Sequence, residues 1–168
     1  MDNQQERLLD EDLNWLAGVW ESEGWFSLID TKRIIRGKEY RSYTPNCGIS
    51  NTDPDFIAAV IKILERSNLA FHVSDRLPNG LGKKNKTEIQ IIGIKRVERF
   101  LNLIFSYMRT KTIQAQIVLD FINYRLSMPR KTPYSERESE MWNSLRNSRL
   151  KVSSTTTRKD TGLQPCMI

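Results

Sequence analysis

One stretch near the N-terminus combines the end of a helix with the start of a strand: residues 16–26 read LAGVWESEGWF. Apolar residues lead into it at the spacing of one helix face, and Asp12 is a candidate N-cap. Gly24 ends the pattern, so a helix is predicted over 12–23. The apolar residues at this spacing are Leu13, Leu16, Ala17 and Trp20.

The segment after this helix predicts a β-hairpin over 25–50, with a basic connection between its strands. Pro45 predicts that the second strand is irregular or bulged, because proline cannot donate to a ladder. Asp53 followed by Pro54 is typical of a helix start, with an N-cap and then proline in the first turn. A second helix is therefore expected over 54–67.

A second hairpin is predicted from strands at 71–74 and 87–92, and three more helices at 95–108, 112–124 and 135–150. The order α-ββ-α-ββ-α-α-α predicts an α+β fold in which four antiparallel strands present one face to the helices.

The length of 168 residues, of which 39% are hydrophobic, indicates one domain with its own hydrophobic core. We expect this domain to span 1–151, with the helix at about 135–150 as its basic C-terminal helix. Residues 152–168 are rich in serine and threonine and are expected to form a flexible tail.

The formal net charge of +6 is unevenly distributed. Residues 1–24 carry a net charge of −6, whereas 31–46 carry +4, and 76–99 and 125–160 carry +5 each. Three basic segments beside an acidic helix favour a surface that binds a polyanion. The alternative is that each basic run is an ordinary solvated surface.

Neither a membrane partner nor secretion is expected. No apolar run approaches the roughly 20 residues of a spanning helix, and the first residues lack the order of a signal peptide. We expect a cytoplasmic, nucleoid-associated protein or an organellar one. Cys47 and Cys166 lie far apart and His72 is the only histidine, so neither a disulfide framework nor a thiolate zinc site is indicated. A metal would need oxygen ligands, and no organic cofactor is expected.

Alternation along the strands separates a buried face, with Phe26 and Leu28, from an open polar face. Such a face suits a DNA major groove, where side chains meet base edges and cations meet phosphates. The alternative is a merely solvated sheet face. The residues of this face and its basic connections, all expected to bind DNA, are Ser27, Ile29, Thr31, Arg33, Arg36, Lys38, Tyr40, Ser42, Thr44, Asn46, His72, Ser74, Arg76, Lys83, Lys84, Lys86, Glu88 and Gln90.

The eleven residues LAGVWESEGWF, 16–26, resemble the signature of the LAGLIDADG homing endonucleases, with Glu21 and Glu23 where that family usually has aspartates. The resemblance covers roughly residues 12–125 and includes one copy of the motif. It implies the family's saddle-shaped α-ββ-α-ββ-α fold, here with extra C-terminal helices, and a homodimer in which two motif helices pack together. The residues then expected at the dimer interface are Leu16, Gly18 and Val19.

The resemblance also implies a metal site at the end of the motif helix. Glu23 is expected to be catalytic and to bind the metal, with the backbone carbonyl of Ser22 completing the coordination. Glu21 is expected to cap or pair at the helix end. The expected ion is Mg²⁺, with Mn²⁺ or Ca²⁺ able to occupy the site, and it would activate water beside the scissile phosphate.

Two further residues are assigned by the resemblance. Asn51, in a strand-to-helix turn, corresponds to a polar amide in the water network of the family's active site; the alternative is that it only shapes the turn before Asp53. Lys111, within the segment RTKTIQAQ at 109–116, corresponds to a catalytic cation near the scissile phosphate.

The sequence therefore predicts a homodimeric, metal-dependent endonuclease of the intron or intein homing type, which cuts double-stranded DNA at a long pseudo-palindromic site. One alternative is a non-cleaving DNA-binding regulator, or an RNA maturase that assists splicing and has its own intron RNA as a partner. Another is a structural protein whose basic runs are solvated surface.

Overall fold

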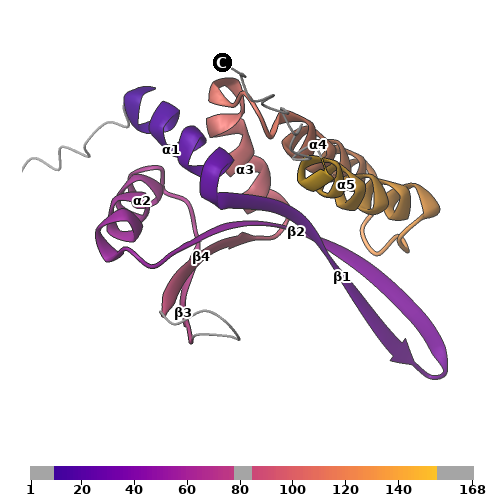
Figure 1. Ribbon diagram of the computed structural model, residues 1–168. Helices are drawn as coiled ribbons and strands as arrows, with labels where there is room; N and C mark the ends of the chain where they lie inside the picture. Colours follow the sequence, from indigo (N-terminus) through magenta and orange to yellow (C-terminus); the bar gives the residue numbers. More distant parts are fainter. Residues whose placement is uncertain (1–9, 78–84, 155–168) are drawn as a thin grey trace, which may run out of the picture.

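The α-helices of residues 10–77 and 85–154 lie on one side of a curved antiparallel sheet (Figure 1). The computed structural model describes residues 10–77 and 85–154, and only the backbone of the last six. The elements in chain order are α1 (Asp10–Glu23), β1 (Gly24–Ile35), β2 (Lys38–Asn51), α2 (Pro54–Arg66), β3 (His72–Arg76), β4 (Lys86–Ile92), α3 (Ile94–Ile104), η1 (Phe105–Tyr107), α4 (Thr112–Ser127) and α5 (Glu136–Ser154).

This order confirms the predicted α+β fold. One predicted helix, 95–108, is divided: α3 ends at Ile104 and a 3₁₀ turn, η1, follows. The chain leaves the helix because Met108 is extended, and the N–H of Met108 donates to the carbonyl of Phe105 at 3.2 Å.

The sheet has the strand order β1-β2-β4-β3, and neighbouring strands are antiparallel throughout. Its register places Ser27 opposite Asn46, and Glu88 opposite both Ser50 and Ser74. Residues directly opposite each other share a face, so the register confirms that the predicted open-face residues lie together.

The alternate side chains of the sheet form the core with the helices. Trp20 of α1 packs on Phe100 of α3, with ring centroids 4.5 Å apart. The sheet residues buried on this side are Phe26, Leu28, Tyr43, Cys47, Ile49, Ile89 and Ile91.

The prediction of an irregular strand at Pro45 is wrong. β2 pairs with β1 without interruption along the whole hairpin. The carbonyl of Pro45 accepts a hydrogen bond from the N–H of Gly93 at 2.9 Å, so the polar edge of Pro45 faces away from β1. Pairing with β4 starts only at Asn46, and the missing N–H of proline therefore breaks no ladder bond.

The C-terminal helix α5 belongs to the same core, on the helix side of the sheet. Nε1 of Trp142 donates to the carbonyl of Leu28 at 3.1 Å, and Leu145 is buried. Glu138, buried as well, pairs with Arg125 of α4 at 3.3 Å. Helix α5 continues past the predicted boundary at residue 151, and the rest of the predicted tail lies outside the described residues.

Over 10–77 and 85–154, no helix has both the length and the apolar character that crossing a membrane requires.

Candidate functional site

The first acidic residue of the motif, Glu21, caps the start of a distant helix. Its Oε1 accepts hydrogen bonds from the backbone N–H groups of Arg109 (2.6 Å), Thr110 and Lys111 (3.1 Å), which lead into α4. Burial alone raises the pKa of Glu21, but these backbone hydrogen bonds outweigh it and leave the pKa below its usual value. The expected capping role of Glu21 is confirmed.

Lys111 makes the reciprocal contact. Its Nζ donates to the carbonyl groups of Gly24 (2.6 Å) and Trp20 (3.3 Å), at the C-terminal end of α1. A cation there complements the helix dipole, as a carboxylate does at the start of α4. Desolvation lowers the pKa of Lys111, although the carboxylates of Glu21 and Glu23 partly offset the effect. The end of α1 and the start of α4 are thus held together by two reciprocal contacts: the carboxylate of Glu21 at the start of α4 and the ammonium of Lys111 at the end of α1.

Glu21→Gln is expected to lower the free energy of unfolding by about 1 kcal/mol at pH 7, because the charged cap of α4 is lost. The pKa of Glu21 is lower in the folded protein than in the unfolded chain. The charge therefore stabilises the fold above the unfolded-state pKa, and this stabilisation is lost as the pH falls through the folded-state pKa. Urea unfolding at a series of pH values would show the difference between the two proteins shrinking in acid.

The matched control for this measurement is Glu65→Gln, because Glu65 is an exposed glutamate of α2. It should change stability little. A difference between wild type and Glu21→Gln that did not vary with pH would contradict the charged cap.

Glu23, the last residue of α1, has an exposed carboxylate that no hydrogen bond or ion pair engages within the described residues. The backbone carbonyl of Ser22 belongs to the same last turn, whose carbonyls have no partner within the helix. Carboxylate and carbonyl oxygens suit Mg²⁺ or Ca²⁺, so the donors fit the expected ion. In the described parts of the chain, no three acidic, histidine or cysteine residues gather into a metal site.

Asn51 is the last residue of β2, two residues after Ile49, which lies opposite Gly24 directly after α1. Its Oδ1 accepts the N–H of Asp53 at 3.0 Å, and Oδ1 of Asp53 accepts the N–H groups of Asp55 (2.9 Å) and Phe56 (3.4 Å) at the start of α2. The role of Asn51 in shaping the turn is therefore confirmed. Its role in a catalytic water network stays a prediction.

The exposed side of α1 differs from the expected dimer interface. Leu16 and Val19 are only 1% and 8% exposed, because they pack into the core of their own chain, so their assignment to the interface is wrong. Gly18 is exposed, and apart from its chain neighbours and the backbone of its own helix, no atom lies within 4 Å of the place where a Cβ would be. Trp15, on the same side of the helix, is 41% exposed and packs its ring 6.0 Å from that of Phe56.

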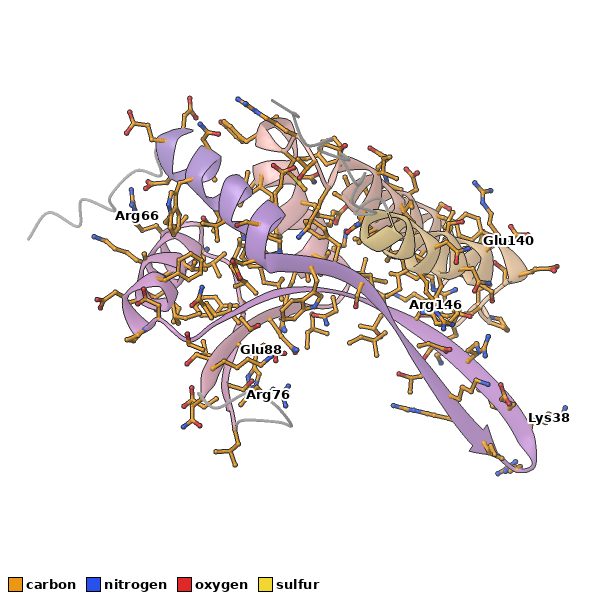
Figure 2. All side chains as sticks on the ribbon, in the orientation of Figure 1. Lys38, Arg66, Arg76, Glu88, Glu140 and Arg146 are labelled. Carbon is orange, nitrogen blue, oxygen red and sulfur yellow. The ribbon has the colours of Figure 1, made fainter. Side chains whose placement is uncertain are left out.

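At the edge of the sheet, Nε of Arg76 at the end of β3 lies 3.1 Å from Oε2 of Glu88 on β4, and this ion pair joins the two strands. Figure 2 shows both side chains on the side of the sheet away from the helices. Asn46 is 6% exposed, so its predicted contact with DNA is wrong: the side chain is covered by its own chain. Two predicted residues lie outside the described residues, Lys83 and Lys84.

The long β1–β2 hairpin, which extends beyond the helices in Figure 1, neutralises its charges on one face only. On the face that continues the core side, Lys32 pairs with Glu39 and Arg41 with Asp30, both at 3.5 Å. Register confirms that these residues share the face of buried Tyr43. The cations of this face are therefore already partnered.

The open face of the same hairpin keeps its cations free. Arg33 lies opposite Tyr40, and Lys38 lies opposite Ile35. Within the described residues, no acid pairs with Arg33 or Lys38. Figure 2 places Lys38 near the tip, where Arg36 and Gly37 form the turn with positive φ angles of 50° and 77°. Within the strands of this hairpin, the cations without an ion pair thus lie on the side predicted to face DNA.

Trp25 also lies on the open face, opposite Gly48, and is absent from the predicted set. The alternation that selects Ser27 and Ile29 also includes Trp25, so the signal was present in the sequence.

No protein-family model matches the chain, and a search of curated proteins finds no match. Solved structures do match. The homing endonuclease I-CvuI, in complex with its target in the presence of Ca, is 18% identical, with 91% of this chain and 88% of that chain covered and a TM-score of 0.57. The archaeal intron-encoded homing endonuclease I-Vdi141I, complexed with DNA, is 16% identical, with 89% of each chain covered and a TM-score of 0.57. The chain has the homing-endonuclease fold.

The LAGLIDADG homing endonuclease I-GzeII, in complex with its DNA target, has this fold as well. It is 14% identical, with a TM-score of 0.55 over 93% of this chain and 53% of that chain. The homing-endonuclease fold confirms the architecture that the resemblance of residues 16–26 implies: a motif helix that runs directly into the first strand of a four-stranded antiparallel sheet.

Proposed function

We propose that this protein is a homodimeric, divalent-metal-dependent endonuclease of the homing type, acting on DNA of the nucleoid or of an organelle. One observation carries the proposal. The two acids of the motif have different surroundings: Oε1 of Glu21 caps a helix, whereas the carboxylate of Glu23 is exposed and makes no hydrogen bond or ion pair within the described residues. A free carboxylate next to a polar sheet face is available for a cation at a phosphate.

Glu23, with the Ser22 carbonyl, would hold the ion, for which we propose Mg²⁺. When bound, such an ion activates water and stabilises negative charge on the phosphate. Lys111 fixes the end of α1 through two backbone carbonyls and so positions the Glu23 carboxylate. The Lys111 ammonium also brings positive charge to the place where a phosphate would bind.

A dimer is proposed because one protomer supplies only half of the residues needed to cut both strands. One protomer presents a single free motif carboxylate, and cutting both strands of a duplex requires two cleavage events. A second copy would supply the second carboxylate through contact along the exposed side of α1, where Gly18 leaves room for a close approach. A two-fold assembly recognises a two-fold site, so the target would be long and pseudo-palindromic.

The distribution of charge supports DNA as the partner. The open face carries the unpaired Arg33 and Lys38, and the core-side face of the hairpin carries ion pairs. I-CvuI and I-Vdi141I, which share the fold, are described in complex with DNA.

The proposal is tested by selecting a cleaved target from a randomised library of DNA duplexes with Mg²⁺ present, and by mapping the ends. We expect a single long site with staggered ends in both strands and no cleavage after chelation of the metal. Specific binding without cleavage would favour a DNA-binding regulator. Binding of intron RNA instead of duplex DNA would favour a maturase.

Two double variants then test the binding face on the recovered target. Arg33→Gln with Lys38→Gln should reduce the slope of log affinity against log salt by about 4, because two phosphate contacts are lost in each protomer of the proposed dimer. Lys32→Gln with Arg41→Gln removes the same charge from the opposite face and should leave the slope nearly unchanged. Equal effects of the two pairs would contradict the proposed face.

A further inference from the structure

One row of residues crosses the open face next to the candidate active site. Trp25 of β1 lies opposite Gly48 of β2, Gly48 lies opposite Gln90 of β4, and Gln90 lies opposite His72 of β3. Trp25 is separated from Glu23 by one residue. The row therefore begins beside the carboxylate proposed to bind the metal.

The indole of Trp25 occupies the space that a side chain at position 48 would fill. A Cβ built on Gly48 would meet Cζ2 of Trp25, and would lie 2.8 Å from its Cη2 and 2.7 Å from the carbonyl oxygen of Ile89. Glycine at this position thus lets the ring pack over the backbone of the central strand. Trp25 is half-buried, and the register places it on the open face.

The open-face neighbours of this ring are polar. Ser27 follows Trp25 on the same face of β1, and Ser50 follows Gly48 on β2. Gln90 completes the surroundings and interacts with Glu88. Trp25 is therefore an apolar surface set among hydrogen-bonding groups.

We infer that Trp25 is a specificity-determining residue that contacts the C5-methyl group of a thymine near the cleaved bond; the inference rests on the proposed function. Base pairs present mainly donors and acceptors in the major groove, and the thymine methyl is the distinctive apolar group there. A ring packed against the sheet backbone can touch the edge of a base, and its position prevents insertion between bases. The accessible apolar surface of Trp25 is therefore complementary to that methyl group.

The experiment uses the target duplex recovered from the randomised library. Each thymine is replaced in turn by deoxyuridine, which removes only the methyl group, and affinity is measured for wild type and for Trp25→Ser. For wild type, one replacement near the cut should weaken binding about fourfold, the effect of exposing one methyl group. Trp25→Ser should bind the methylated and unmethylated duplexes equally at that position.

Two variants separate this contact from a general effect on the sheet. Trp25→Phe keeps an aromatic ring and should retain a reduced methyl preference, whereas Ile34→Ser removes an exposed apolar side chain from the opposite face of the hairpin and should leave the preference intact. Circular dichroism and thermal unfolding would identify a variant that does not fold. If Trp25→Ser does not fold, the comparison of wild type with Trp25→Phe tests the inference.

Methyl preferences that are the same in wild type, Trp25→Ser and Trp25→Phe would overturn the inference, as would a target without thymine near the cut. Both outcomes would leave the endonuclease proposal standing, because they require a cleaved target. Failure to recover any target would contradict the proposed function itself, and the assignment of Trp25 with it.

Discussion

Glu23→Gln is expected to abolish DNA cleavage while leaving DNA affinity nearly unchanged. Glutamine keeps the shape of the side chain but loses the charge that would hold the divalent ion. A loss of about 10²–10³-fold or more in the cleavage rate is expected for removing a group that stabilises charge at the reacting phosphate. The measurement is single-turnover cleavage of the recovered target with Mg²⁺, alongside binding of the same duplex with Ca²⁺.

The matched control is Glu11→Gln, an exposed glutamate in the first turn of the same helix, which should cleave at the wild-type rate. Persistent cleavage by Glu23→Gln would remove Glu23 from the metal site. Equal loss of cleavage and of binding would assign Glu23 to DNA recognition instead.

Gly18→Leu is expected to convert a dimer into a folded monomer without activity. Within the protomer, the new side chain would meet open space, and leucine is a better helix former than glycine by about 1 kcal/mol. The isolated chain should therefore be at least as stable as wild type. In a dimer joined along α1, the added bulk would hold the two helices apart and so separate the two carboxylates.

Sedimentation analysis should show a halved mass for Gly18→Leu, and thermal unfolding at low concentration should show no loss of stability. Ala58→Leu, on the exposed side of α2, is the control for added bulk and should remain dimeric. An unchanged mass for Gly18→Leu would exclude this part of α1 from the interface.

The sequence allowed the fold to be predicted because its local signals agree. The helical spacing that ends at Gly24, the cap at Asp53 and the alternation of the strands all indicate the same architecture, and the structure has it. The open face could be predicted as well, because side chains alternate with a period of two and the register keeps them together.

Contacts between residues that are far apart in the sequence could not be predicted. Glu21 finds its partners about 90 residues away, at the start of α4, so only a general capping role could be assigned to it. Leu16 and Val19 fit the motif, but the sequence does not show that the core of the protomer covers them. The same holds for Asn46, whose polar character predicts exposure although neighbouring elements bury it.

The two faces of the β1–β2 hairpin differ in what a substitution would affect: the core-side face serves stability, and the open face is proposed to serve DNA recognition. Side chains that hold the sheet to the helices lie on one face, and Arg33 and Lys38 lie on the other with no acidic partner in the described chain. Substitutions at exposed positions away from the core usually alter stability by less than about 0.5 kcal/mol. New DNA preferences could therefore be acquired by single substitutions on the open face while the helices and the motif stay as they are.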